Sequence, residues 1–423
     1  MNLPQWLERI ERQHPRAIAL GLDRVREVAQ RMRLARPAKR VIVVGGTNGK
    51  GSTVAFIEAI ARAAGWRTGA YTSPHLVAYN ERVRIDGRDA GDEALVAGFE
   101  AVEAARGDVP LTYFEYGTLC ALWLFARERL DLAVLEVGLG GRLDAVNIVD
   151  ADVSVITTVD IDHVDWLGAD REAIGFEKAG IARPWKPLVL GDDDPPASVL
   201  RHAYAIGASA VRANCDFFFG PLDGGPGDEA RWEWREVGRR YELPLPALAA
   251  PVQLRNAATA IAALRALRVP LAEEAIGRGV AQAQVAGRLQ RFDRGGVAVL
   301  VDVGHNPQAA RELARWLRRE QAAGRTLAVF AALGDKDAAG VATALGGTVD
   351  AWHLAGLEDA GPRGLGVDAF AARLAGTPAA GGARHATVRD ALAAALAAAA
   401  PGDRILVFGS FHTAAAAIQA LAV

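Results

Sequence analysis

The chain alternates between short runs of Val, Ile and Leu and longer segments in which apolar residues recur every three or four positions. Strands buried on both faces of a parallel sheet produce the first pattern, and amphipathic helices produce the second. In the first half of the chain the short runs predict strands at 41–44, 132–137, 153–159 and 188–190. In the second half they predict strands at 297–303, 326–332, 352–354 and 405–408, and helices at 253–267, 271–283 and 308–319. This alternation is typical of α/β proteins with mostly parallel sheets flanked by helices.

Two segments interrupt the alternation. Pro, Gly, Trp and charged residues crowd together at 217–245, and 231–241 alternates like an exposed antiparallel hairpin, so we expect a small β appendage at about 212–248. Residues 287–292 follow neither period, and we expect them to be a hinge. The prediction is therefore a first domain at 1–286 and a second, smaller, Rossmann-like α/β domain at 293–423.

Length and composition are those of a multi-domain globular protein. The 423 residues exceed what one core needs, and 51% hydrophobic with 23% charged residues exclude wholesale disorder. A net charge of -2 argues against non-specific nucleic-acid binding, and two cysteines, Cys120 and Cys215, are too few for a disulfide framework. The sequence shows no signal peptide at residues 1–12 and no long apolar run, so we expect a cytoplasmic protein.

The predicted strand at 41–44 runs into a glycine-rich turn, which reads GGTNGKGST over 45–53, and then into a helical pattern. The backbone N–H groups of such a turn, the positive end of the helix and the ammonium of Lys50 together bind phosphate, and Ser52 can reach Mg²⁺. Gly51 intervenes between Lys50 and Ser52, which departs from the common spacing. A solvated lysine in a plain turn is the alternative. We predict a P-loop-type sheet with ATP contacts at Gly49, Lys50, Gly51 and Ser52.

This loop resembles that of the folylpolyglutamate synthase and dihydrofolate synthase family, which is related to the Mur amino-acid ligases. Further blocks match in the same order along almost the whole chain, at 71–76, 80–86, 112–118, 135–147, 158–163, 177–181 and 302–307. The resemblance implies a Mur-ligase-like ATPase domain followed by a glutamate-binding domain. It also implies an ADP-forming ligase of folate biosynthesis, which adds L-glutamate to dihydropteroate and to tetrahydrofolate polyglutamates through an acyl phosphate.

Three residues are candidates for metal binding or catalysis. Glu136 lies in a predicted strand, where its carboxylate can bind Mg²⁺ or form a salt bridge, and His163 lies among acidic residues after another strand. Taken alone, Lys178 is typical of a surface lysine. The resemblance implies a metal site of Ser73, Glu136 and His163, and a carboxylated, catalytic Lys178 beside catalytic Lys50 and His163. The resemblance also implies two Mg²⁺ ions as cofactors of the enzyme, with a monovalent cation as a further candidate.

The block at 112–118 combines aromatic residues with an acid, which suits a flat pterin ring, although an aromatic core patch at a helix start gives the same pattern. The resemblance implies pterin contacts at Thr112, Tyr113, Phe114, Glu115, Leu143, Asp144 and Ala145. It implies further ATP contacts at Asn256, Arg288 and Asp302. It also implies a glutamate pocket at His305 and Ser410, for which a helix N-cap at Ser410 is the alternative.

The expected partners are therefore small molecules, namely ATP, L-glutamate, dihydropteroate and reduced folates, with no nucleic acid, no membrane and a monomeric chain. One alternative is a Mur-type ligase acting on a UDP-linked cell-wall precursor, but only residues 1–40 precede the first strand. The other alternative is a P-loop regulatory NTPase, for which the balanced charge offers no basic face.

Overall fold

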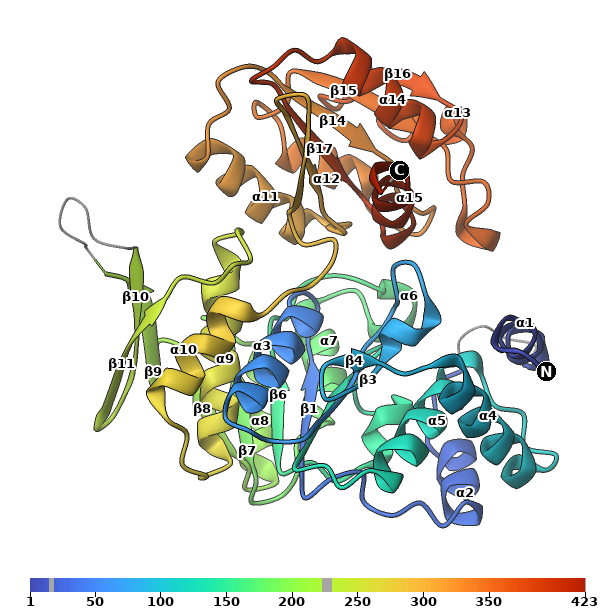
Figure 1. Ribbon diagram of the computed structural model, residues 1–423, viewed down its shortest axis with the longest axis vertical. Helices are drawn as coiled ribbons and strands as arrows, with labels where there is room; N and C mark the ends of the chain where they lie inside the picture. Colours follow the sequence, from blue (N-terminus) through green and yellow to red (C-terminus); the bar gives the residue numbers. More distant parts are fainter. Residues whose placement is uncertain (15–18, 223–229, 423) are drawn as a thin grey trace. The chain divides into compact units, whose positions relative to one another are not determined.

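The computed structural model describes residues 1–14, 19–222 and 230–422, which fall into two compact units. Unit 1 comprises Met1–Ala247 and Gln253–Gln284, and unit 2 comprises Leu248–Val252 and Val285–Val423. Each unit contains a mostly parallel sheet flanked by helices (Figure 1), so the predicted fold class is confirmed.

Unit 1 is built on an eight-stranded sheet in the order β4-β3-β2-β5-β1-β6-β7-β8. Its strands are β1 (Arg40–Gly45), β2 (Thr68–Tyr71), β3 (Val83–Ile85), β4 (Arg88–Asp89), β5 (Leu132–Glu136), β6 (Val153–Ile156), β7 (Pro187–Leu190) and β8 (Ser209–Arg212). The strands from β2 to β8 in this order are parallel, and β3 and β4 extend the edge in antiparallel pairing. The pattern of apolar residues predicted β1, β5, β6 and β7, whereas β3 and β4 are too short to register and β2 (TGAY) and β8 (SAVR) have too few bulky apolar residues.

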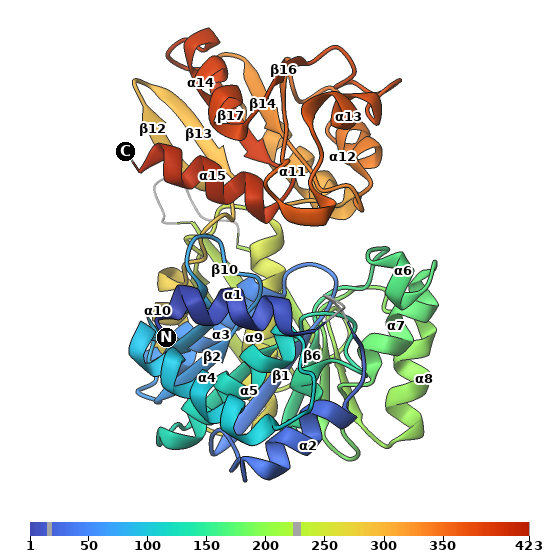
Figure 2. The ribbon, with the colours of Figure 1, turned by 90° about the vertical axis from the view of Figure 1, so that its right-hand side faces the viewer.

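Helices cover both faces of this sheet (Figure 2). They are α1 (Leu3–Gln13), α2 (Asp23–Arg31), α3 (Lys50–Ala63), α4 (Asp92–Arg106), α5 (Tyr113–Arg127), α6 (Val164–Leu167), α7 (Arg171–Ala179), α8 (Ala197–Ala205), α9 (Val252–Ala266) and α10 (Glu273–Gln282), with 3₁₀ turns η1 (Tyr79–Arg82) and η2 (Ala145–Ile148). One face shares a core with α4, α5, α7 and α8, while α3 packs on β1, β2, β5 and α10. No helix of the described residues has the length and hydropathy of a membrane span.

Local signals fix where several helices begin. Thr112 caps α5 by accepting a hydrogen bond from the Glu115 N–H, and the Glu115 carboxylate in turn accepts one from the Thr112 N–H. Asn2 and Gln5 form the same reciprocal capping box at the start of α1. Because each box satisfies two backbone groups that a helix start leaves unpaired, the pattern of Thr or Asn followed three residues later by Glu or Gln sets the boundary.

A three-stranded antiparallel sheet, β9 (Phe217–Pro221), β10 (Arg231–Glu236) and β11 (Arg239–Pro244), forms the predicted appendage. The sequence suggested an exposed hairpin, but one face of it is buried. Trp232 and Trp234 are fully buried, and the Trp234 indole N–H donates to the Ala258 carbonyl on α9 at 3.1 Å. The alternation therefore marks one face packed on the α9 helix. Residues 223–229 of the predicted appendage lie outside the described residues.

Unit 2 has a six-stranded sheet in the order β12-β13-β17-β14-β15-β16. Its elements are β12 (Gln290–Arg294), β13 (Val297–Val301), β14 (Thr326–Phe330), β15 (Ala351–Ala355), β16 (Ala383–His385) and β17 (Arg404–Phe408), with α11 (Pro307–Arg319), α12 (Ala338–Ala344), α13 (Val367–Ala372), α14 (Val388–Ala398), α15 (Phe411–Leu421) and the 3₁₀ turn η3 (Gly361–Arg363). All pairs are parallel except β12 with β13. Gln290–Arg294 is therefore a strand, where the sequence suggested irregular structure, and a hinge at 287–292 stays a prediction.

Glu103 on α4 holds the N-terminal helix against the rest of unit 1. Its carboxylate accepts hydrogen bonds from Arg106 (Nε at 2.7 Å and Nη2 at 2.9 Å), from Arg9, from the Tyr116 hydroxyl and from Gln13. The hydrogen bonds from Arg106, helped by those from Tyr116 and Gln13, lower the pKa of Glu103 to about 2 against the opposing effect of burial. The ionised carboxylate is thus a stabilising group of this corner.

We expect Glu103→Gln to lower the free energy of unfolding at pH 7 by about 1–3 kcal/mol, because charge-assisted hydrogen bonds are lost. The folded pKa, about 2, lies below the ordinary value of 4.5, so the stabilisation is complete above pH 4.5 and is lost as the pH falls toward 2. Urea unfolding at pH 7 and pH 3 should therefore show a smaller difference between wild type and variant at the lower pH.

Glu8→Gln is the matched control, since Glu8 is exposed on α1 and pairs with Arg12 across one helical turn. It should change stability by less than about 0.5 kcal/mol. An equal loss for Glu103→Gln at both pH values would mean that packing, not the carboxylate charge, holds this corner.

Candidate active site

Four neighbouring parallel strands of unit 1 end at the predicted catalytic residues. Lys50 follows β1, Ser73 follows β2, Glu136 closes β5 and His163 follows β6. Since β2, β5, β1 and β6 are adjacent in that order and all parallel, their carboxyl ends lie along one edge of the sheet. This edge is where open α/β sheets bind their ligands.

The glycine-rich loop is held against the loop that follows β6. The Thr47 N–H donates to the Thr158 carbonyl at 2.7 Å, and the Asn48 N–H donates to the Thr158 hydroxyl at 3.1 Å. Gly46 has a φ of 143°, and a Cβ at this position would lie 1.9 Å from the Thr157 hydroxyl oxygen. Only glycine fits there, because the backbone of one loop approaches the side chain of the next.

The loop ends in the start of α3, where two buried hydroxyl groups have no partner among the described residues. Gly49 precedes the helix with a φ of 85°, and the helix begins at Lys50. The side-chain oxygens of Ser52 and Thr53 are buried and accept or donate no hydrogen bond within the described ranges. Buried hydroxyls normally find a partner, and a phosphate oxygen or its metal ion at this helix start would supply one.

Two lysine ammonium groups converge on one backbone carbonyl of the loop. Nζ of Lys50 donates to the Gly46 oxygen at 3.1 Å and to the Thr47 oxygen at 3.2 Å, while Nζ of Lys178 donates to the same Gly46 oxygen at 2.9 Å. Lys178 is buried on α7, so the sequence-based impression of a surface lysine is wrong. Burial, and next the charge of Lys50, lower the pKa of Lys178 to about 7.

A hydrogen bond links two of the three predicted metal ligands. The Ser73 N–H donates to Oε2 of the buried Glu136 at 3.1 Å. His163 stands before α6 with a left-handed backbone (φ 53°), and its Nε2 lies 4.0 Å from Oδ2 of Asp162. Over the described ranges, no three His, Cys, Asp or Glu side chains are gathered around one point. The set of Ser73, Glu136 and His163 stays a prediction that rests on the shared sheet edge.

Asn256 lies against the phosphate loop although it is far from that loop in the sequence. It is buried on α9, and a Cβ on Gly49 would come within 2.6 Å of its Oδ1. Its side-chain amide donates to Gln253 at 2.9 Å. An amide held at the start of α3 is placed to contact whatever the loop binds.

The polar groups of the predicted pterin block are used within the fold. Thr112 and Glu115 form the capping box of α5, and Glu115 also pairs with Arg24 at 2.9 Å. Asp144 accepts from the Leu139 and Val146 N–H groups, and its burial raises its pKa to about 7. These contacts give each of these acids a structural role, so pterin binding by them stays a prediction.

The aromatic side chains of the predicted pterin block are more accessible to a ligand than its acids are. Phe114 lies against Gly138 and Tyr71, with 5.9 Å between the two ring centroids of Phe114 and Tyr71. Tyr113 meets Tyr79 edge to face at 5.9 Å. Both aromatic side chains are partly exposed, as is Leu143 in the loop after β5, whereas Ala145 is buried.

In unit 2, the predicted ATP and glutamate residues gather at the ends of β13 and β17. The buried Asp302 accepts from the Leu289 and Gly304 N–H groups at 2.9 and 2.7 Å, and burial raises its pKa above the usual value. The Arg288 guanidinium lies over the Phe411 ring at 5.7 Å, and the His305 ring lies 6.3 Å from Phe411. Phe411 is thus a shared neighbour that the sequence did not indicate.

Ser410 caps α15, accepting from the Thr413 N–H at 3.0 Å, so the N-cap alternative describes its observed contact.

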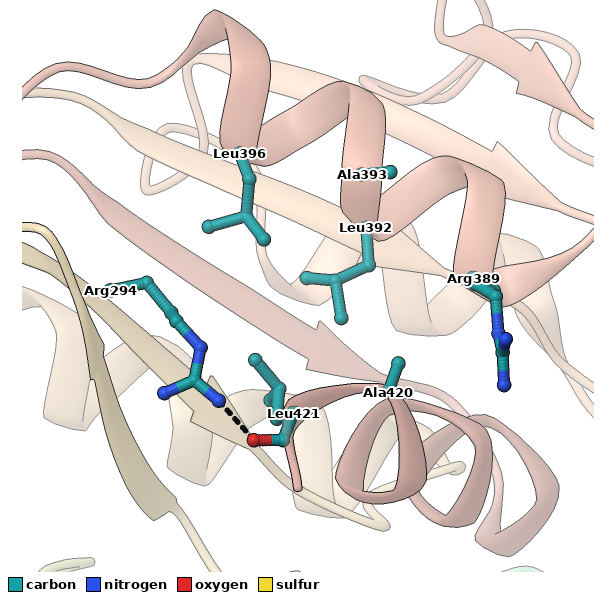
Figure 3. A pocket seen from close by; sticks show the side chains of 7 residues that line it. All are labelled: Arg294, Arg389, Leu392, Ala393, Leu396, Ala420 and Leu421. Carbon is teal, nitrogen blue, oxygen red and sulfur yellow. Dashed lines mark hydrogen bonds between the residues drawn. The ribbon is translucent and has the colours of Figure 1, made fainter. Parts of the chain in front are cut away.

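A cavity of about 260 Å³ lies elsewhere in unit 2, between α14 and α15 (Figure 3). Leu392, Leu396 and Leu421 line it, with Arg294 at one end bonded to the Leu421 carbonyl. None of its lining residues is a predicted site residue.

Sequence reasoning missed the residues that hold the phosphate loop in place. Thr157 and Thr158 directly follow a buried strand, which is the signal that could have identified them. The capping box of Thr112 and Glu115 could also have been recognised, because its spacing is visible in the sequence. Arg24 and Phe411 carry no such local signal.

Two family models match the chain. The Mur ligase middle domain matches residues 44–213, which contain the phosphate loop, and the Mur ligase glutamate ligase domain matches residues 287–411. The chain therefore has the middle and glutamate ligase domains of the Mur ligases.

Individual relatives identify the family within the Mur ligases more closely. The chain is 44% identical to an Escherichia coli dihydrofolate synthase/folylpolyglutamate synthase over 99% of its length and 95% of that protein. A structure of E. coli FolC in complex with DHPP and ADP has a TM-score of 0.92 at 44% identity, covering 99% of this chain and 97% of that one. A bifunctional folylpolyglutamate synthase/dihydrofolate synthase with Mn, AMPPNP and L-glutamate bound has a TM-score of 0.91 at 43% identity, covering 100% and 98%. The chain belongs to the dihydrofolate synthase/folylpolyglutamate synthase family.

We expect Gly46→Ala to abolish nucleotide binding, because the new methyl group must push Thr157 and the phosphate loop apart. Titration with a fluorescent ATP analogue should show the loss, and a thermal melt should show a lower Tm.

Gly65→Ala is the matched control, since Gly65 also has a positive φ (82°) but no atom lies within 4 Å of the place that its methyl group would take. It should cost about 1 kcal/mol of stability and leave nucleotide affinity unchanged. Equal nucleotide affinity in both variants would contradict the close approach.

Proposed function

We propose that this chain uses ATP to join L-glutamate to dihydropteroate, forming dihydrofolate, and to extend tetrahydrofolate polyglutamates. The observation that carries the proposal is the identity of 44% across 99% of the chain with a dihydrofolate synthase/folylpolyglutamate synthase. Relatives are solved with DHPP and ADP, and with Mn, AMPPNP and L-glutamate, which are the classes of ligand this reaction needs. These relatives favour the folate ligase over the UDP-precursor and regulatory alternatives.

The reaction begins with attack of the acid substrate's carboxylate on the γ-phosphorus of ATP, which releases ADP and leaves an acyl phosphate. The glutamate amine then attacks the acyl carbon, and phosphate leaves as the amide forms. Lys50, the N–H groups of the glycine-rich loop and the N-terminus of α3 would neutralise the negative charge on the transferring phosphoryl group. Gly49, Gly51 and Ser52 would line the phosphates, with Asn256 beside them.

A divalent ion fits the carboxyl edge of the sheet, because the buried carboxylate of Glu136 and the hydroxyl of Ser52, which has no partner among the described residues, are oxygen donors of the kind Mg²⁺ prefers. Ser73, Glu136 and His163 would hold it, and when bound it would lower the charge repulsion between nucleotide and substrate carboxylate. Two Mg²⁺ ions and a monovalent cation are parts of the same proposal.

Unit 2 would supply further contacts to the nucleotide and the contacts to L-glutamate. Arg288 and Asp302 would contact the nucleotide, and His305 with Ser410 would bind L-glutamate, because they gather at the carboxyl ends of β13 and β17. We propose further that the protein acts as a cytoplasmic monomer on small molecules, without nucleic-acid or membrane partners, in keeping with its balanced charge.

Lys50→Met should lower kcat by about 100-fold or more, since one preorganised cation at the phosphoryl group is lost. The assay follows radiolabelled L-glutamate into product with MgATP and either dihydropteroate or tetrahydrofolate. Lys39→Met is the control, because Lys39 is exposed and pairs with Asp131 at 2.7 Å. Phosphate release by the wild type that ignores both acceptors would refute the proposed function.

We also propose that Lys178 is carboxylated. A neutral amine adds CO₂ and loses a proton to become an anionic carbamate, and the pKa of about 7 leaves much of the Lys178 amine neutral at physiological pH. The carbamate would replace a second cation beside Lys50 with an anion, which removes the repulsion between them.

With ¹³C-labelled bicarbonate, the wild type should give a carbamate NMR signal that weakens as the pH falls through about 7, because the amine becomes protonated. Lys178→Met should lack the signal, and Lys186→Met should keep it, since Lys186 is a half-exposed surface lysine near Asp152. A wild type without the signal well above that pH would exclude the modification.

A further inference from the structure

Arg82 is a buried cation with an unusual set of neighbours. Only 9% of its surface is exposed, and it stands at the end of η1, next to the start of β3. Its guanidinium carbon lies 5.3 Å from the centroid of the Tyr79 ring and 5.4 Å from that of the Tyr113 ring. The two aromatic faces stabilise the positive charge without neutralising it.

One nitrogen of this guanidinium is fixed by a histidine. Nε of Arg82 donates to Nδ1 of His75 at 2.8 Å. Because this hydrogen bond needs a lone pair on Nδ1, the proton of the neutral His75 ring is on Nε2. His75 in turn packs against Tyr79, with 5.8 Å between the ring centroids. The plane of the Arg82 guanidinium is therefore set by three side chains.

No described carboxylate neutralises Arg82. Its two terminal nitrogens make no hydrogen bond or ion pair within residues 1–14, 19–222 and 230–422, and neither is enclosed. Arg84, two residues further along, shows the usual arrangement, since its guanidinium pairs with Glu58 at 2.9 Å. A largely buried guanidinium without a counter-ion is stabilised when a ligand supplies an opposite charge at its open terminal nitrogens.

Arg82 also adjoins the predicted catalytic edge. Its carbonyl accepts a hydrogen bond from the Thr72 N–H at 2.9 Å, and the N–H of the next residue, Ser73, donates to Glu136. On its other side it touches Tyr113, a predicted pterin contact. The Arg82 backbone thus adjoins the strand end that carries the proposed metal ligands, and its guanidinium lies against a predicted pterin contact.

We propose that Arg82 binds a carboxylate of the pterin-bearing acid substrate and orients it, an inference that rests on the proposed function. A guanidinium with its Nε occupied still offers N–H groups on both terminal nitrogens, which match the two oxygens of one carboxylate. The carboxylate is the aminobenzoate group of dihydropteroate or a glutamyl group of a reduced folate. His75 is the positioning residue that fixes the guanidinium plane.

The test compares Arg82→Lys, Arg82→Ala and the control Arg84→Lys with the wild type. A charge-assisted hydrogen-bond pair corresponds to about a 10- to 100-fold change in affinity, so KM for the acceptor should rise by that factor in both Arg82 variants. KM for ATP and for L-glutamate should stay unchanged, and Arg84→Lys should behave as the wild type. A rise for dihydropteroate alone assigns the aminobenzoate carboxylate, and a rise for tetrahydrofolate alone assigns the glutamyl group.

Equilibrium binding keeps the test decisive if Arg82→Ala folds poorly. Intrinsic fluorescence quenching gives Kd for dihydropteroate and for tetrahydrofolate, each compared with its amide, in which uncharged CONH₂ replaces the carboxylate. The wild type should prefer the acid, and Arg82→Lys should lose about tenfold of that preference. An unchanged preference for both acids, or a change confined to ATP or L-glutamate, would overturn the inference, whereas a wild type that incorporates no glutamate would overturn the proposed function.

Discussion

The contact between the loop after β1 and the loop after β6 is the constraint on which the rest of the site depends. Gly46 passes so close to Thr157 that no side chain fits, and Thr158 holds the following N–H groups. This contact turns the Gly46 carbonyl toward the ammonium groups of Lys50 and Lys178. Burial and the repulsion from Lys50 lower the pKa of Lys178 to about 7, and a phosphate beside Lys50 or a carbamate on Lys178 would relieve that repulsion.

The same edge carries two buried acids, Asp144 and Glu136, and Lys50 acts on the ionisation of Asp144. Asp144 has a pKa of about 7 because burial outweighs its backbone hydrogen bonds and the attraction of Lys50. Glu136 is buried next to the Ser73 N–H. Charges of both signs are thus collected at the ends of four parallel strands, where Glu136, Asp144 and Lys178 are buried. Such an environment strengthens each interaction with a charged substrate.

Several candidate residues serve the fold as well as, or in place of, a ligand. Thr112 and Glu115 close the start of α5, and Ser410 closes the start of α15. Residue type alone does not separate these roles, because a hydroxyl or a carboxylate that caps a helix is also a good ligand for a polar substrate. Arg82 differs from them, since its terminal nitrogens have no partner in the part of the chain that the structure describes.

The sequence by itself determined the alternating architecture, the glycine-rich phosphate loop and the family, because these depend on local period, local turn chemistry and ordered motifs. It did not register β2, β3 and β12, which are too short or too polar to show a period, and it suggested a surface position for Lys178. Only the tertiary structure decided which strands are neighbours, and hence that Ser73 meets Glu136 and that Asn256 meets Gly49. Burial and charge at a given atom depend on such distant contacts, so the pKa of Lys178 and the surroundings of Arg82 emerge only once the chain is folded.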